Sequence, residues 1–149
     1  SQDTFTPFID GLIKKTRTTA MRAFMHTQIP VLKQNIDDSF RRQVYFGGTE
    51  QPWADLITYT KTKRMIKGTW YGEANSTLKE TFRMFNRIKA GGSVGKDATG
   101  AFFARLQTTD RVALEHQHGT SKMVARPPYS LLAETQVKLV TSAVKFIMS

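Results

Sequence analysis

Three short stretches of the sequence carry residue types that can do chemistry: a glycine-rich segment, a pair of histidines and a pair of aspartates. The glycine-rich segment, residues 90–100, contains Gly95-Lys96-Asp97. A phosphate-binding P-loop needs a glycine five positions before its Gly-Lys pair and a Ser or Thr after it, so that backbone amides and a hydroxyl hold the phosphates and Mg²⁺. Ala90 and Asp97 occupy those two positions here. We therefore expect a flexible hairpin tip in this segment and no nucleotide site.

The histidines are His116 and His118, a spacing that places two imidazoles on one side of a strand, where zinc can use them. A structural zinc site needs about four ligands and a catalytic one about three, and the remaining histidine, His26, lies far away in the sequence. The aspartates, Asp37 and Asp38, are adjacent and would diverge by about 100° on a helix. The sequence therefore predicts no metal site, no acid–base pair, no cofactor and no enzyme activity.

Composition narrows the class of protein further. The chain has 149 residues, of which 40% are hydrophobic and 23% charged, which is typical of a single globular domain, here residues 1–149. It has no cysteine, so disulfides, thiolate metal sites and cysteine nucleophiles are excluded. No apolar run approaches the roughly 18–20 residues that span a bilayer, and Ser1 to Thr4 do not start a basic leader. We expect no retained signal peptide and no membrane partner.

Positive charge is concentrated in the middle of the chain. Lys and Arg outnumber Asp and Glu by 22 to 12, a net charge of +10, and residues 61–100 hold nine basic against three acidic residues. Such a field attracts polyanions or acidic protein surfaces, and basic residues between aromatic ones can contact phosphates and stack bases. A solvated surface that keeps the protein soluble is the alternative explanation. The candidate contact residues are Lys61, Lys63, Arg64 and Lys67, flanked by Tyr59, Trp70 and Tyr71.

Helices are predicted at both ends of the chain. Residues 6–44 show apolar side chains at three- and four-residue spacing, as in one buried stripe. Pro30 either kinks this helix or starts a second one, and Gly47-Gly48 is expected to end it. Residues 133–147 show the same spacing. The first stripe includes Phe8, Ile9, Leu12, Ile13, Ala20, Phe24 and Met25, and the last consists of Ala133, Val137, Val140, Val144 and Ile147.

The part between the helices has a different character. Residues 49–72 show no helical period and predict a long, partly ordered basic loop with a short helical turn. Residues 81–89 and 101–107 alternate in polarity and predict a long, flexible β-hairpin over 81–107, with a third short strand at 112–116. The fold class is therefore α+β, with a helical N-terminal third and a C-terminal helix packed on a small antiparallel sheet.

Five short stretches, in this order, resemble the virion-morphogenesis (tail-completion) proteins of long-tailed bacteriophages. They are a Trp-containing segment, a Lys/Arg-rich segment, a segment that leads into a strand, a His-Gln turn, and an Ala-Arg-Pro segment before the last helix. The sequence departs from the family pattern at His118 and Pro128, where aromatic residues are usual, and at the helix-capping residue Leu132. The matching residues are Gln51-Pro-Trp-Ala-Asp-Leu56, Thr60-Lys-Thr-Lys-Arg64, Asn75-Ser-Thr-Leu-Lys-Glu-Thr-Phe82, His116-Gln-His-Gly119 and Val124-Ala-Arg-Pro-Pro128.

The resemblance implies a structural subunit of the phage neck or tail top that forms a closed ring, hexameric among the options, around the DNA channel. The implied partners are copies of itself and the neighbouring tail-tube and head–tail connector proteins, with nonspecific contact to genomic DNA. Its implied location is the virion, after assembly in the host cytoplasm. The alternative is a basic, nonspecific DNA-binding module of phage or plasmid origin. The expected packing or subunit anchors are Trp53, His116, Gln117, Gly119, Arg126 and Pro127.

Overall fold

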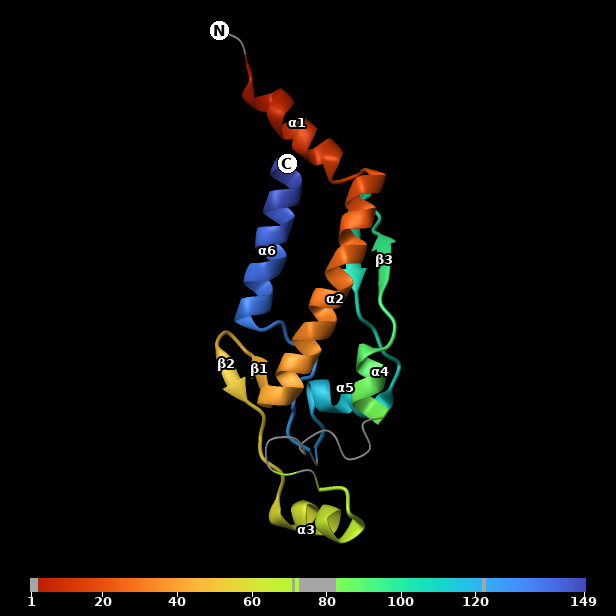
Figure 1. Cartoon of the computed structure of the whole chain (residues 1–149), viewed down its shortest axis with the longest axis vertical. Helices are drawn as coiled ribbons and strands as arrows, with labels where there is room; N and C mark the ends of the chain where they lie inside the picture. The colour runs from red at the N-terminus through yellow and green to blue at the C-terminus, as the bar shows by residue number, and fades with distance from the viewer. Residues whose placement is uncertain (1–2, 71, 73–82, 122) are drawn as a thin grey trace.

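The computed structural model describes residues 3–70, 72, 83–121 and 123–149, and within these ranges six helices and two two-stranded antiparallel sheets form an α+β fold. The elements follow one long axis, with α1 at one end and α3 at the other (Figure 1). The helices are α1 Phe5–Lys15, α2 Thr19–Arg42, α3 Thr58–Lys67, α4 Arg83–Lys89, α5 Arg111–His118 and α6 Ala133–Met148. The strands are β1 Val44–Phe46, β2 Glu50–Pro52, β3 Ser93–Lys96 and β4 Phe102–Arg105.

Most of the other elements pack against the long helix α2. The structure also corrects the predicted boundaries of the N-terminal helical segment. The segment breaks at residues 16–18, and Pro30 lies inside α2. The break is favoured because the Thr16 and Thr18 hydroxyls donate to the nearby carbonyls of Ile13 and Lys15, which competes with the helical ladder. The helix ends at Arg42, not at Gly47-Gly48. Those glycines instead lie between β1 and β2, which pair as a short hairpin.

The second hairpin joins β3 to β4 and lies against α2. The predicted hairpin over 81–107 is therefore correct in kind but begins later, at residue 93. Gly95 stands opposite Phe103, and a Cβ on Gly95 would approach the Phe103 ring to 2.4 Å. The turn between the strands is held by Asp97, whose carboxylate accepts hydrogen bonds from the backbone of Thr99 and Ala101. Gly95 and Lys96 thus lie in strand β3 and Asp97 lies in the turn, whereas the whole of residues 90–100 was expected to form the flexible tip.

Two segments predicted as strands are helices. Residues 81–89 were expected to alternate, but α4 occupies 83–89, where Met84 and Ile88 are buried four residues apart. Phe85 lies on the same side and meets Phe40 with ring centroids 4.8 Å apart, which explains why Phe85 did not fit the alternation. Residues 112–116 belong to α5, because Asp110 caps its start by accepting from the Ala113 backbone N–H at 3.2 Å. Short segments of this kind fit either period, so packing decides between them.

The predicted basic loop over 49–72 also contains regular structure. Strand β2 occupies its start, and α3 covers ten residues, Thr58 to Lys67. Gly68 ends α3 in the left-handed conformation with φ 72°, and its N–H bonds the last carbonyls of the helix. The basic run is therefore presented on a helix.

The core lies where the C-terminal half of α2 meets α4, α5 and the end of β2. Phe40 is its centre and contacts the Trp53 ring edge-on, with centroids 5.0 Å apart. Asn35, also buried in α2, fixes the chain before α6: its amide donates to Ser130 O at 2.7 Å, and its oxygen accepts from Leu132 N at 3.0 Å. The buried core residues are Ile36, Phe40, Trp53, Met84, Ile88 and Ala113.

Helix α6 is confirmed close to its predicted bounds and lies beside α2 (Figure 1). Phe146 stacks on Phe24 of α2 with centroids 4.6 Å apart. The predicted apolar stripe of α6 does not pack against the rest of the subunit, however. Val137, Val140 and Val144 of this stripe are exposed. The N-terminal stripe shows the same difference in α1, which has no buried residue.

Candidate assembly surfaces

The six predicted anchors meet around one buried guanidinium. Arg126 donates through Nε to Ala54 O at 2.6 Å and through Nη2 to Asp55 O at 2.9 Å. Next to it in the chain, Pro127 accepts through its carbonyl from Trp53 Nε1 at 3.2 Å. These bonds tie the segment before α6 to the segment after β2. We call the group formed by Trp53, His116, Gln117, Gly119, Arg126 and Pro127 the Arg126 cluster.

The C-terminal end of α5 forms the other side of the Arg126 cluster. The His116 carbonyl accepts from Arg126 N at 2.8 Å, and the Gln117 side chain accepts from Tyr129 N at 3.0 Å. Gly119 has φ +75°, and a Cβ there would lie 3.1 Å from Ala125 N, so this close approach requires glycine. All six members therefore make contacts inside the subunit.

Two ionisable groups in the Arg126 cluster and beside it have shifted pKa values. Burial, and then the positive charge of Arg126, lower the pKa of His116 below its ordinary value of 6.5. A hydrogen bond from Lys61 and one from the Leu56 backbone hold the pKa of Asp55 below its usual range. Among the described residues, His116 Nδ1 and Tyr129 Oη are buried without a hydrogen-bond partner.

The four predicted basic contact residues divide between two sides of α3. Lys61 Nζ bonds Asp55 Oδ2 at 2.8 Å. Arg64 is half-buried, and burial of Arg126 and then the positive charge of Arg64 lower the pKa of Arg126. Lys63 and Lys67, one turn apart, are exposed. Lys63 Nζ also lies 5.9 Å from the centre of the exposed Tyr59 ring. The surface that α3 offers to a partner therefore contains Lys63, Lys67 and Tyr59 together with the exposed Met65 and Ile66.

Each of the two terminal helices carries an exposed apolar surface, and the sequence analysis placed both in the interior. On α1, Phe5 and Phe8 are 70% and 50% exposed. On α6, the exposed fractions are 64% for Val137, 63% for Val140 and 55% for Val144. We call these two sets, with Ile13 and Met148, the α1 stripe and the α6 stripe. Periodicity marks an apolar face but does not tell whether the same chain covers it.

An apolar groove of about 450 Å³ lies beside the α6 stripe. It runs between α2, β4 and α6, and Val140 belongs to both the groove and the stripe. Its lining contains no charged residue; it includes Phe24, Leu32, Phe103, Leu131, Leu139 and Ala143. Isolated exposed apolar residues are ordinary, whereas a stripe continuous with a groove is typical of a binding surface.

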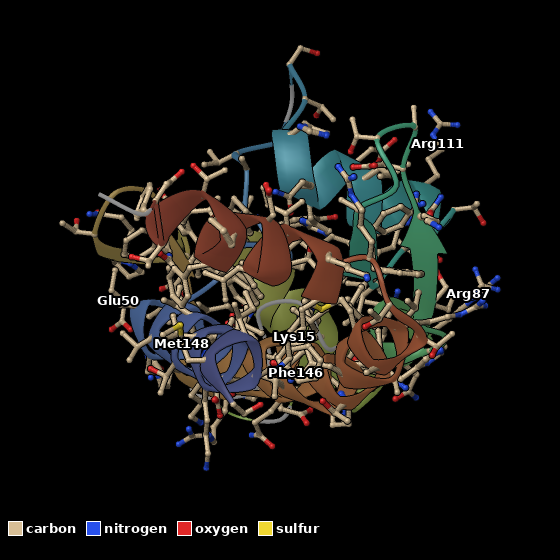
Figure 2. The ribbon with its side chains drawn as sticks, turned by 90° about the horizontal axis from the view of Figure 1, so that it is seen from above. Lys15, Glu50, Arg87, Arg111, Phe146 and Met148 are labelled. Carbon is tan, nitrogen blue, oxygen red and sulfur yellow. The ribbon has the colours of Figure 1, made fainter. Side chains whose placement is uncertain are left out.

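A polar cavity lies on the side of the fold away from α6, and its aspartate is bonded within the subunit. It is lined by Arg87, Asp110 and Arg111, among others, and Figure 2 shows Arg87 and Arg111 on the outside of the fold, away from α6. Arg87 Nη1 bonds Asp110 Oδ2 at 2.7 Å, and this bond lowers the pKa of Asp110. Asp110 also caps α5, so its carboxylate is already occupied.

Comparison of the chain with models of protein families, with curated proteins and with solved structures found no match. Within the described ranges, no group of three or more His, Asp or Glu side chains is placed to hold a metal ion. In the same part of the chain, no helix combines the length and apolar character needed to cross a membrane. The resembling segment at residues 75–82 lies outside the described residues.

Proposed function

We propose that this chain is a non-enzymatic structural subunit that assembles with copies of itself into a closed ring at the head–tail junction of a long-tailed phage. The observation that carries the proposal is that two apolar helix faces, the α1 stripe and the α6 stripe, are exposed on one small subunit. Contiguous apolar faces of this kind mark protein–protein contacts. The sequence resemblance to tail-completion proteins supplies the phage setting.

Two different faces on one subunit suit a ring. When unlike faces meet, each added copy leaves one face of each kind open, and the chain of copies closes if the rotation between neighbours allows it. The Arg126 cluster would keep each copy rigid while these contacts form. Lys63, Lys67 and Tyr59 on α3 lie far from α1 along the long axis and would face acidic neighbours or the DNA in the channel (Figure 1).

Deleting the gene in a phage that encodes the chain tests the proposal. We expect filled heads and separate tails in electron micrographs, and restored particles when the wild-type chain is supplied. A second variant, Lys63→Glu with Lys67→Glu, should lower the titre by orders of magnitude while the purified chain stays folded. Arg41→Glu with Arg111→Glu changes the net charge equally at exposed sites away from α3 and is the matched control. Normal tailed, infectious virions from the deletion would contradict the proposal.

The second candidate is a nonspecific DNA-binding module. The net charge of +10 and the outward position of Lys63 and Lys67 beside Tyr59 favour it. Fluorescence anisotropy with a labelled DNA duplex separates the two functions. Submicromolar binding by the isolated chain that weakens steeply with salt would favour the DNA-binding module. Weak binding at physiological salt would favour the ring subunit.

A further inference from the structure

We propose that the α1 stripe of one copy docks on the α6 stripe and its adjoining groove in a second copy. This inference deepens the proposed function, because it names which two faces meet when copies of the chain assemble. The occupant is thus a segment of the chain itself, the N-terminal helix with Phe5 and Phe8.

Within one copy, the α1 stripe lies away from the α6 stripe. Lys15, the last residue of α1, donates through Nζ to the carbonyl of Ser149, the last residue of the chain, at 2.5 Å. Lys15 Nζ also lies 5.2 Å from the centre of the Phe146 ring (Figure 2). From this junction α1 runs onward past the end of α6 (Figure 1). A helix rises about 1.5 Å per residue, so Phe5 lies roughly 15 Å beyond the junction.

The two surfaces are complementary in shape. The α1 stripe projects large aromatic side chains from the first two turns of a helix. The α6 stripe presents short valine side chains beside an apolar groove of about 450 Å³, which has room for a phenylalanine ring. Small side chains on one helix let large ones on the other enter between them. Covering both stripes removes the exposed parts of seven apolar side chains from water: Phe5, Phe8, Ile13, Val137, Val140, Val144 and Met148.

Charge also favours this pairing over the alternatives. Copies with a net charge of +10 repel one another, so contact is favoured where like charges are absent. The end of α1 that carries Phe5 and Phe8 has Asp3 and Asp10 beside these residues in the sequence, and the basic residues of the helix, Lys14 and Lys15, lie in its last turn at the other end. The α6 stripe is bordered by Lys138 and Lys145, both exposed. Pairing α6 with α6 would bring these lysines together, whereas α1 brings acidic side chains near them.

A mixing experiment tests the pairing. One variant, Phe5→Asp with Phe8→Asp, removes the α1 stripe, and a second, Val140→Asp with Val144→Asp, removes the α6 stripe. We expect the wild-type chain to self-associate in sedimentation velocity and each variant alone to associate at least tenfold more weakly. Mixed together, the two variants should form a 1:1 dimer that does not grow, because one intact contact remains. Val112→Asp with Leu114→Asp changes exposed apolar residues of α5 and should leave association unchanged.

Cross-linking gives an independent readout, because the chain has no cysteine of its own. Phe8→Cys mixed with Val140→Cys should form an intermolecular disulfide under mild oxidation, whereas Ile66→Cys on α3 mixed with Val140→Cys should not. The inference is overturned if the α1 variant associates like the wild type, if the mixture yields no 1:1 dimer, or if the wild-type chain stays monomeric. Rings that persist in both variants would overturn the pairing and leave the proposed function standing. A phage that assembles without the chain would overturn the function and leave the pairing standing.

Discussion

Arg126 joins three segments of the chain through one side chain and its own backbone. The guanidinium bonds Ala54 and Asp55 after β2, and the Arg126 N–H bonds the His116 carbonyl at the end of α5. The Arg126 side chain is buried, and its two hydrogen bonds to these carbonyls are partly buried. A buried charged donor of this kind stabilises the fold only while each of its hydrogen-bond acceptors is in place.

We predict that Arg126→Gln lowers the free energy of unfolding by about 1–3 kcal/mol, because two partly buried carbonyls lose a charged donor. Urea unfolding followed by Trp53 fluorescence measures the change, since Trp53 lies in the same cluster. Arg111→Gln is the control: its side chain is 90% exposed and bonds only Glu115 among the ion pairs of the described residues. It should change stability by less than about 0.5 kcal/mol. Equal losses in both variants would contradict the structural role of Arg126.

His116 predicts a dependence of stability on pH. Burial and Arg126 lower its pKa below the ordinary value of 6.5, so the unfolded chain takes up a proton more readily than the folded chain. The stabilisation is complete above about pH 7 and is lost as the pH falls through the ordinary value toward the folded one. The free energy of unfolding should therefore decrease from about pH 7.5 to pH 5.5.

His116→Gln should remove most of this slope, and His118→Gln, at an exposed residue of the same helix, should retain it. Urea titrations at several pH values measure both variants. The lowered pKa values of Asp55, Asp97, Asp110 and Glu134 act at lower pH, because their stabilisation is lost progressively below about pH 5. A slope that persists in His116→Gln would assign it to other groups.

At the scale of elements, α2 accepts a proline in its interior. Pro30 has no N–H to donate to the helical ladder, and its side chain is exposed, so it gains little from packing. We predict that Pro30→Ala raises the free energy of unfolding by about 1–3 kcal/mol, the difference in helix propensity between these residues. Far-UV circular dichroism during urea unfolding measures it, with Gln34→Ala at another exposed position of α2 as the control. A loss of stability would mean that Pro30 is needed to place α2 on the β3–β4 hairpin.

The elements that the sequence predicted correctly are the long periodic ones. Residues 133–147 repeat apolar side chains over four turns, and only a helix fits that length. Residues 81–89 form too short a segment to distinguish the 3.6-residue period of a helix from the two-residue alternation of a strand. The burial of Met84 and Ile88 against α2 therefore decides for a helix. Helix α3 was predicted only as a short helical turn within a loop, because its sequence is largely polar and basic, which is also typical of a loop.

The candidate site was likewise predictable only in part. Trp53, Gln117, Gly119 and Arg126 were selected from short sequence stretches, and the structure brings these distant stretches together in one cluster. The direction of the α1 and α6 stripes could not be read from periodicity, because it depends on where each helix lies relative to the body. Of the basic residues, the sequence could not tell that Lys61 pairs with Asp55 while Lys63 points outward.

At the scale of the whole molecule, the net charge of +10 opposes any assembly of like copies. In the proposed assembly, copies would therefore associate where uncharged surface is large enough to outweigh the repulsion, and the terminal helices would supply that surface. Salt screens repulsion between exposed charges over a Debye length of about 10 Å at 0.1 M and leaves apolar burial nearly unchanged. Binding to DNA responds in the opposite direction, because it depends on counterion release.

We therefore predict that raising NaCl from about 50 mM to about 500 mM weakens duplex DNA binding by roughly a hundredfold or more and leaves self-association unchanged or stronger. Sedimentation velocity and fluorescence anisotropy on the same samples measure the two responses. The α1 variant, Phe5→Asp with Phe8→Asp, provides the internal control, since it should lose self-association at every salt concentration while retaining the DNA response. Self-association that falls with salt in parallel with DNA binding would mean that charged contacts, and not the two apolar stripes, hold the copies together.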